Sequence, residues 1–374
     1  MSFAAFVYVT FEIFTVGLIS PMAHDLGVAE SRIGLLMTVY AGVVAVVTLP
    51  VMWFARKLDK RPLFLLTLAF LLLGTVLQAT AASYAMLVAA RVAAALTHGV
   101  FWALVAPMAT RLAPAGSSGK AIGMVSIGST MAMVLGSPLS TLLGELSGWR
   151  AATWVLGALT VLAVAVLVRT LPPLPPVPAT ERELHLGASR WGLPSLVVYL
   201  LLTCTAAFAG YTYLGLILKE TVNQSLVPVG LVAFGLFGLV GVMLAARFVD
   251  HRMIRATLLV TGGMVVAAVL GEGAFLLGGG SAAALMFGAI AIWGVAYGAL
   301  PTVATTFFLH AGRKNPDAAS SIYVVTFQVG IASGAAAGSV VVDAGQISLT
   351  LWIMAVLAVL GLTVLLGWSR PLLR

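Results

Sequence analysis

Three ionisable side chains lie inside apolar stretches of the chain, where water would not screen their chemistry. Glu12 lies in the first such stretch, and Arg91 and His98 lie in the fourth. A charged side chain at membrane depth costs about 3 kcal/mol or more, so it marks a proton or substrate site by default. Burial and a nearby guanidinium act in opposite directions on the protonation of a carboxyl, which would let protonation follow conformation and substrate. These residues are the candidate proton-coupling group; the alternative is a static polar network with a neutral, hydrogen-bonded His98.

The composition indicates that these stretches cross a membrane. Of the 374 residues, 61% are hydrophobic and 9% are charged, whereas about a quarter of a typical soluble protein is charged. A helical span needs about 20 largely apolar residues. We predict an all-α integral membrane protein with spans near residues 3–21, 33–55, 62–82, 84–110, 120–143, 151–171, 193–217, 227–246, 256–277, 283–309, 318–342 and 347–368. These are twelve spans, and the length of the first favours a retained segment over a cleaved signal peptide.

Basic residues in the short loops predict how the chain crosses the membrane. Of the 20 lysines and arginines, Arg91 lies in a span, and Arg32, Arg150 and Lys219 fall in one set of alternate loops. The other sixteen fall on the opposite side, which the positive-inside rule assigns to the cytoplasm together with both termini. Scattered loop charges account for the net charge of +8 without a nucleic-acid partner. The single cysteine, Cys204, excludes disulfides and cysteine-rich metal sites within one chain.

A proline-rich segment and an internal repeat predict two halves. Residues 172–190 are rich in proline and charge, as in a semi-rigid linker. The turns after spans two and eight share the pattern Arg-x-x-Asp-x-Arg; duplication explains it, with chance similarity as the alternative. The candidate gating or structural residues in these turns are Arg56, Asp59, Arg61, Arg247, Asp250 and Arg252. We predict a six-helix half at residues 1–171, a cytoplasmic linker at 172–191 and a second six-helix half at 192–374, a known transporter arrangement.

Longer motifs resemble one family of membrane proteins. The basic turns, Leu87-x-x-x-Arg91, and the glycines from Gly128 to Gly136-Ser137-Pro138 are similar to the major facilitator superfamily. The strings that resemble bacterial sugar efflux transporters of the drug:proton antiporter group are Glu12-x-x-x-Val16-Gly17-Leu18, Thr97-His98-Gly99-Val100-Phe101-Trp102, Arg111-Leu112-Ala113-Pro114-Ala115-Gly116, Ala132-Met133-Val134-Leu135-Gly136 and Gly148-Trp149-Arg150. The resemblance implies proton-coupled export across the bacterial inner membrane by alternating access. It also implies that Gly128, Gly136 and Pro138 serve gating or structural roles.

Substrate contacts in such a protein would come from aromatic rings and hydrogen-bonding side chains, because a sugar has hydroxyls and weakly apolar faces. The candidates are Tyr8, Tyr40, Trp102, Tyr211, Tyr213, Trp293, Tyr297 and Gln328. Gln328 is the strongest candidate in the second half, because an amide in so apolar a span needs a partner. Tyr211 and Tyr213 cannot share one helical face unless the helix breaks there, and any single aromatic residue can instead face lipid. The family's polar positions nearby are occupied here by Ala207 and Gly215.

The remaining motifs favour a transporter over an enzyme or a receptor. The sequence has no Walker phosphate-binding loop, no metal-ligand cluster and no recognisable pair of nucleophile and base. We expect no cofactor, and we expect a monomer in a lipid membrane that handles protons and a sugar or sugar-like solute. Export of a drug or another small metabolite is the alternative function. Glu272, near the outer end of span nine, is a competing acid whose position an exposed interfacial residue would also explain.

Overall fold

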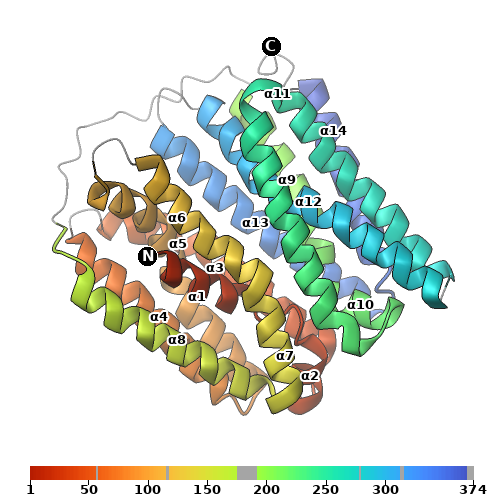
Figure 1. Cartoon of the computed structure of the whole chain (residues 1–374), viewed down its shortest axis with the longest axis horizontal. Coiled ribbons are helices and arrows are strands. Elements are labelled where there is room, and N and C mark those ends of the chain that lie inside the picture. Colours follow the sequence, from red (N-terminus) through yellow and green to blue (C-terminus); the bar gives the residue numbers. More distant parts are fainter. Residues whose placement is uncertain (56–57, 115–117, 175–191, 278, 312–315, 369–374) are drawn as a thin grey trace.

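Every regular element in the described part of the chain is a helix. The computed structural model describes residues 1–55, 58–114, 118–174, 192–277, 279–311 and 316–368. Eleven segments are long and apolar enough to cross a membrane, and the shorter apolar helix Ser2–Ile13 is a twelfth. These segments confirm the predicted all-α, twelve-span fold. They pack side by side in one bundle (Figure 1).

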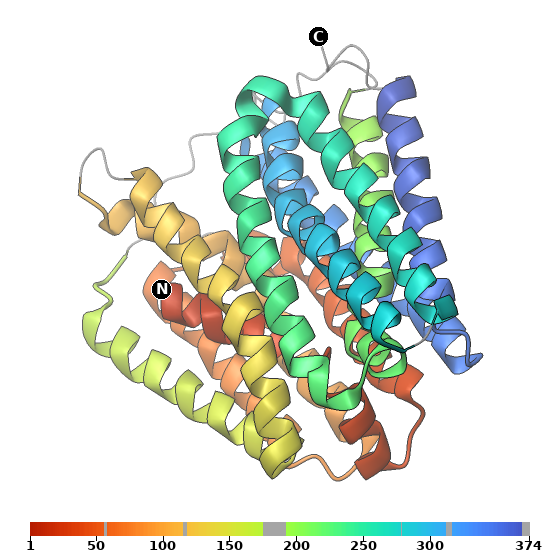
Figure 2. The ribbon, with the colours of Figure 1, turned by 45° about the vertical axis from the view of Figure 1, so that its right-hand side comes forward.

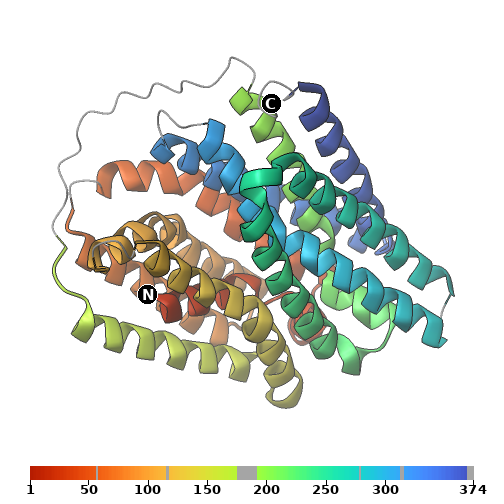
Figure 3. The same ribbon diagram turned by 45° about the horizontal axis from the view of Figure 1, so that its top comes forward.

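The helices form two groups that lie next to each other (Figure 3). The first group is α1 (Ser2–Ile13), α2 (Ile19–Leu26), α3 (Glu30–Ala55), α4 (Lys60–Ala79), α5 (Tyr84–Leu112), α6 (Ser118–Met131), the π-helical turn η1 (Ala132–Gly136), α7 (Ser137–Ser147) and α8 (Trp149–Thr170). The second group is α9 (Gly192–Tyr211), α10 (Leu214–Thr221), the 3₁₀ turn η2 (Gln224–Leu226), α11 (Val227–Leu277), α12 (Gly279–Ala311), α13 (Pro316–Asp343) and α14 (Leu349–Trp368). α3 and α13 meet along the boundary. Most of the predicted linker, residues 175–191, lies outside the described residues, and the domain boundaries stay a prediction.

The first predicted span is not a single helix. Residues 14–18 separate α1 from α2, and there the Val16 N–H donates to the carbonyl three residues earlier at 3.1 Å. Pro21 has no N–H to donate to the Gly17 carbonyl, which weakens helical continuation across this point. Gly17 also permits close packing, because a Cβ here would overlap a threonine side chain of α7. Span one is therefore broken just beyond Glu12.

The seventh predicted span is broken as well, between Tyr211 and Tyr213. α9 ends at the first of these tyrosines, and the Tyr213 N–H donates to the carbonyl three residues earlier at 3.0 Å. The two breaks meet across the boundary, because a Cβ on Gly215 would overlap the backbone carbonyl of Val16. Glycine at position 215 thus allows the backbones of the two groups to touch.

Predicted spans eight and nine form one continuous element, α11, where two helices and a turn were expected. Helical structure persists from Val227 to Leu277, and the ribbon doubles back at its upper end (Figure 2). The two arms hold the membrane-length segments Gln224–Ala245 and Arg255–Leu277. The expected turn contains the second basic motif but neither glycine nor proline between residues 242 and 261, so no residue there stops the helix.

The fifth span contains the π-helical turn η1 directly before Pro138. The Ser137 N–H donates to the Ala132 carbonyl, five residues back, so the helix widens where proline removes an ordinary donor. A Cβ on Gly128 or on Gly136 would overlap atoms of α1. These glycines therefore let the fifth span lie tightly against the helix that carries Glu12.

Polar side chains join the two groups at one end of the bundle. Lys219 Nζ lies 3.4 Å from Glu30 Oε1, and the Ser31 hydroxyl donates to Asp343 Oδ1 at 2.9 Å. These residues lie in or beside the loops that the charge pattern assigns to the outer side of the membrane. The groups are therefore held together at the predicted outer end.

Candidate functional site

Glu12 lies where the two groups of helices meet. It occupies the last turn of α1, and its Oε2 is 3.9 Å from Nε2 of His98 on α5. The Gln328 side chain on α13 is the polar neighbour of this carboxyl from the second group, and its Oε1 has no hydrogen-bond partner among the described residues. The Glu12 side chain is 13% exposed, and that of His98 is 2% exposed. The candidate acid thus has one polar neighbour from each group.

Arg91 holds the backbone of α1 rather than the Glu12 carboxylate. Its Nη1 donates to the Phe11 carbonyl at 2.7 Å and to the Glu12 carbonyl at 3.1 Å. The Glu12 carbonyl is available because α1 ends here and the helix supplies no further N–H donor. The Phe11 carbonyl accepts a long hydrogen bond from the Phe14 N–H at 3.4 Å and has a second lone pair for Arg91. A cation at a helix C-terminus also interacts favourably with the helix dipole. The guanidinium is fully buried and stacks 4.8 Å from the Phe11 ring centroid.

Arg91 contacts Glu12, as expected, but through the Glu12 main-chain carbonyl. His98 lies closer to Glu12 than we expected from its position along the fourth span. Arg91 and His98 are seven residues apart, so both lie on one face of α5. Glu12 spans that distance, with its carbonyl at Arg91 and its carboxylate at His98. Two further nitrogens of Arg91, Nε and Nη2, have no hydrogen-bond partner among the described residues.

Tyr40 fixes the orientation of His98. The Tyr40 hydroxyl and His98 Nδ1 are 2.7 Å apart, which leaves Nε2 directed at Glu12. The two rings meet edge to face with centroids 5.2 Å apart. Because Tyr40 comes from α3 and His98 from α5, this hydrogen bond ties two helices to the acid on α1. A fixed imidazole beside a carboxyl is an arrangement that can pass a proton.

Tyr8 and Trp102 flank His98 but use their polar atoms differently. The Tyr8 hydroxyl donates to the Thr67 carbonyl at 2.9 Å and lies 3.2 Å from Thr97 Oγ1. Its ring centroid is 5.4 Å from that of His98, and the Trp102 ring centroid is 6.3 Å from it. Tyr8 is thus engaged in packing α1 against α4 and α5, and Trp102 is the partly buried neighbour.

Aromatic rings gather in the second group of helices, close to Glu12. Tyr211 on α9 and Tyr297 on α12 have ring centroids 4.6 Å apart, and the Glu12 carboxyl acts electrostatically on both hydroxyls. Phe208 and Phe234 complete the group at 5.5 Å and 5.2 Å from the Tyr297 centroid. We call Phe208, Tyr211, Phe234 and Tyr297 the aromatic cluster. The two phenylalanines were not predicted, although Phe208 precedes Tyr211 by three residues and so shares its helix face.

Trp293 and Tyr213 lie at the edge of the site. The Trp293 ring packs edge to face on Phe234 with centroids 5.6 Å apart, and a Cβ on Gly210 would overlap it. Tyr213 lies apart from Tyr211, because its hydroxyl donates to the Ala335 carbonyl at 3.0 Å and its ring contacts Gly34. The structure therefore uses Tyr213 in the contact between α3 and α13, outside the aromatic cluster.

The residues of the two basic turns lie away from Glu12. Asp59 caps α4 by accepting a hydrogen bond from the Arg61 N–H at 2.8 Å, and Arg61 Nη2 donates to the Val168 carbonyl at 2.7 Å. The Arg247 guanidinium lies 5.9 Å from the Phe248 ring centroid. Arg56 lies outside the described residues, as do the side chains of Asp250 and Arg252.

Glu272 is partly buried instead of exposed at the interface as its position indicated. It lies in the second arm of α11, and its Oε2 has no hydrogen-bond partner among the described residues. Leu351 of α14 and Met286 of α12 lie beside the neighbouring Gly271. Glu272 therefore lies beside the packing contact of α11 with α12 and α14.

A twelve-span helical bundle with ionisable residues at the boundary between its two groups of helices defines a multi-pass membrane transporter. The chain belongs to the Major Facilitator Superfamily, whose family model matches residues 1–316. This match confirms the family resemblance, and it excludes the enzyme alternative.

Two named relatives of the chain are efflux proteins from bacteria. The chain is 36% identical to a chloramphenicol efflux pump of Mycobacterium tuberculosis, over 91% of this chain and 84% of that protein. It is 31% identical to a protein of Mannheimia succiniciproducens named "probable sugar efflux transporter", over 92% of this chain and 86% of that protein.

Solved structures share the fold at low sequence identity. A POT family transporter in complex with 5-aminolevulinic acid has a TM-score of 0.79 at 11% identity, covering 100% of this chain and 96% of that one. A bacterial homologue of the lysosomal transporter Spinster, inward-facing and unoccupied, has a TM-score of 0.75 at 14% identity, with the same coverage.

Proposed function

We propose that the protein is a proton-coupled efflux transporter that exports small uncharged solutes by alternating access. The observation that carries the proposal is the position of Glu12, whose carboxyl lies between His98 of the first group of helices and Gln328 of the second. A carboxyl that has partners on both sides of a moving boundary changes its surroundings when the groups rock. Its protonation then depends on which side is open.

The contacts of Glu12 support a specific division of roles. Arg91 holds the carbonyls at the end of α1, so the carboxylate itself stays free to gain or lose a proton. His98, oriented by Tyr40, is the group that delivers or accepts that proton through Nε2. Gln328 senses the protonation state, because a carboxylate accepts hydrogen bonds and a protonated carboxyl can also donate one.

The cargo we propose is a sugar or sugar-like molecule. Tyrosine and glutamine side chains can hydrogen-bond its hydroxyls, and the rings of the aromatic cluster can stack on its weakly apolar faces. Among the described residues, Arg91 is the one lysine or arginine that is buried, and an anionic cargo would call for more cationic residues in the site, so a neutral cargo is favoured.

Export of an aromatic drug is the second candidate. Phe208, Tyr211, Phe234 and Tyr297 present more ring surface than hydrogen-bonding atoms, which suits an aromatic solute. The relative named a chloramphenicol efflux pump is consistent with such a cargo. Both candidate cargos would be exported through the same proton site. The same proteoliposomes can therefore be tested with each cargo to distinguish the two.

Flux measurements in proteoliposomes test the proposal. Labelled sugars and chloramphenicol are offered under an imposed pH gradient, and in a separate arm under equal pH with solute on both sides. We expect Glu12→Gln to lower gradient-driven flux at least about tenfold while solute exchange at equal pH persists, since a glutamine keeps the shape but not the proton.

Glu220→Gln is the matched control, because Glu220 is an exposed acid in α10 and the same change there removes no partner from the site. If Glu12→Gln transports every accepted solute under the pH gradient as fast as the unchanged protein does, Glu12 does not couple transport to protons. Flux of chloramphenicol without flux of any sugar would replace the first cargo with the second.

A further inference from the structure

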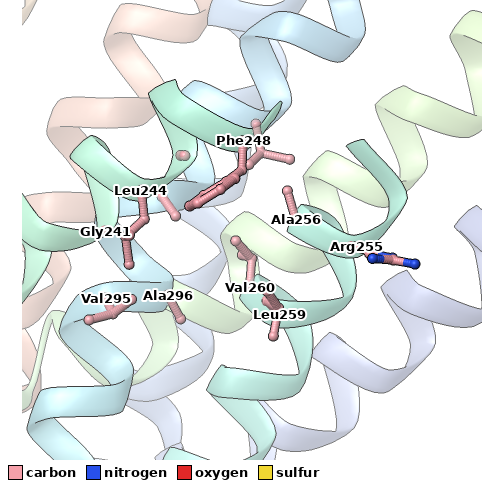
Figure 4. Close-up of a pocket in the computed structure, with 12 residues that line it drawn as sticks. Gly241, Leu244, Phe248, Arg255, Ala256, Leu259, Val260, Val295 and Ala296 are labelled. Atoms are coloured by element: carbon pink, nitrogen blue, oxygen red, sulfur yellow. The ribbon is translucent and has the colours of Figure 1, made fainter. Parts of the chain in front are cut away.

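A groove opens on the side of the second group of helices, away from Glu12. Its volume is about 320 Å³, within the range of about 300–1,000 Å³ that holds small ligands. The two arms of α11 and the facing part of α12 line it (Figure 4). Its walls are almost wholly apolar, with residues such as Gly241, Phe248, Ala256, Leu259 and Ala296.

Small residues create the groove. The first arm of α11 packs directly on α12, since a Cβ on Gly241 would overlap the Val295 carbonyl. The second arm approaches α12 through Gly263, where a Cβ would come close to Ala296. Between these contacts and the point where α11 doubles back, the space enclosed by the two arms and α12 is bordered by the small residues Ala245, Ala256 and Ala299 and stays unfilled.

The groove faces the outside of the bundle. Leu259 is 75% exposed and Phe248 is 45% exposed, although both line it. In a membrane these side chains meet lipid acyl chains. The groove therefore has an opening through which an acyl chain can enter from the bilayer.

Two cations flank the end of the groove where α11 doubles back. Arg255 is one of its lining residues, is exposed, and has no hydrogen-bond or ion-pair partner among the described residues. Arg247 lies against Phe248 on the opposite arm. The positive-inside pattern assigns this end to the cytoplasmic leaflet, where anionic lipids meet basic residues beside spans.

We propose that this groove binds one anionic phospholipid, with an acyl chain between the arms of α11 and the headgroup phosphate at Arg255. The apolar walls supply packing but little preference, because bulk lipid offers the same contacts. The preference for a negative headgroup comes from the cations, at about fivefold in affinity per basic residue near the membrane surface. This site is independent of the proton site, because its lining residues do not include Glu12 or any of its neighbours.

Native mass spectrometry of the full chain tests the proposal. The protein is released from nanodiscs that contain equal amounts of phosphatidylglycerol and phosphatidylethanolamine, and retained lipids are counted. We expect one phosphatidylglycerol in preference to phosphatidylethanolamine. Arg255→Gln should lower that preference about fivefold, and Ala256→Phe, which fills the groove, should abolish retention of the lipid.

Arg169→Gln is the matched control, because Arg169 is an exposed arginine in the last turn of α8, on the same predicted membrane side and away from the groove. Equal retention of both lipids by the unchanged protein, or an equal loss in Arg169→Gln and Arg255→Gln, would overturn the proposal. Two other occupants are also detected. If Ala256→Phe changes the dimer fraction or chloramphenicol flux while the lipid is retained, the groove serves a second copy or a solute, and the lipid proposal is wrong.

Discussion

Arg91 offers the sharpest test of how the site is built, because its hydrogen bonds go to the backbone. Arg91→Met keeps an apolar stem of similar length but removes the guanidinium donor from the Phe11 and Glu12 carbonyls, of which Phe11 keeps only the long bond from the Phe14 N–H at 3.4 Å. A hydrogen bond to a charged group contributes about 1.5–3 kcal/mol, so the two together contribute about 3–6 kcal/mol. Removing the two unpartnered nitrogens Nε and Nη2 offsets about 2 kcal/mol of this loss, at about 1 kcal/mol each, the low end for a buried unsatisfied group.

The net destabilisation expected for Arg91→Met is about 2–3 kcal/mol, which corresponds to a fall of roughly 5 °C in Tm for a chain of this size. The Tm of Arg91→Lys should fall by about half as much as that of Arg91→Met. The lysine ammonium can reach a carbonyl but does not reproduce the planar stacking on Phe11. Thermal unfolding in detergent, followed by tryptophan fluorescence, measures both. Arg169→Met is the control, since it removes an exposed arginine.

A Tm for Arg91→Met within about 1 °C of the unchanged protein would refute the view that Arg91 secures the end of α1. So would a Tm for Arg91→Lys as low as that of Arg91→Met, because the retained cation would then contribute nothing. The assay needs no substrate, so its outcome does not depend on the proposed cargo.

Two further substitutions test the contacts around this end of α1. Tyr40→Phe removes the 2.7 Å contact with His98 Nδ1, a hydrogen bond that contributes about 1 kcal/mol. Because about 1 kcal/mol corresponds to about fivefold, gradient-driven flux should fall about fivefold. Flux equal to that of the unchanged protein would show that His98 does not need Tyr40 to orient it. Gly215→Val places a side chain against the Val16 carbonyl and should separate the two breaks. The yield of cross-linking between cysteines introduced on α2 and α10 should then fall. Gly42→Val is the control, because the space beside Gly42 is open. Undiminished cross-linking in Gly215→Val would mean that the two backbones need not touch.

The sequence was sufficient for the number of spans, since hydropathy is a local property. It also singled out Glu12 as an isolated charge in an apolar stretch, and the role of Glu12 stays a prediction. The sequence was insufficient where tertiary contacts decide. The hydropathy of residues 3–21 conceals the break after α1, because apolar residues continue through it. The pairing of Arg91 with carbonyls followed from that hidden break, and depth counting alone indicated only that it lies near Glu12.

Tyr213 shows the same limit in a different form. Its residue type fits a binding site, and a break near it was recognised as the condition for grouping it with Tyr211. The break exists, yet it turns Tyr213 toward Gly34 and the Ala335 carbonyl. Periodicity tells which residues share a helix face, but it cannot tell which way the chain turns after the helix ends.

The break after α1 links the proton site to the contact between the two groups of helices. On one side of it, the exposed carbonyls at the end of α1 bind Arg91 and so position the Glu12 carboxyl beside His98. On the other side, Val16 touches Gly215 at the corresponding break of the second group. Only three residues lie between Glu12 and Val16, so a movement that parts the two breaks also moves the carbonyls that Arg91 holds. An uninterrupted α-helix would bond those carbonyls internally and would provide no such connection.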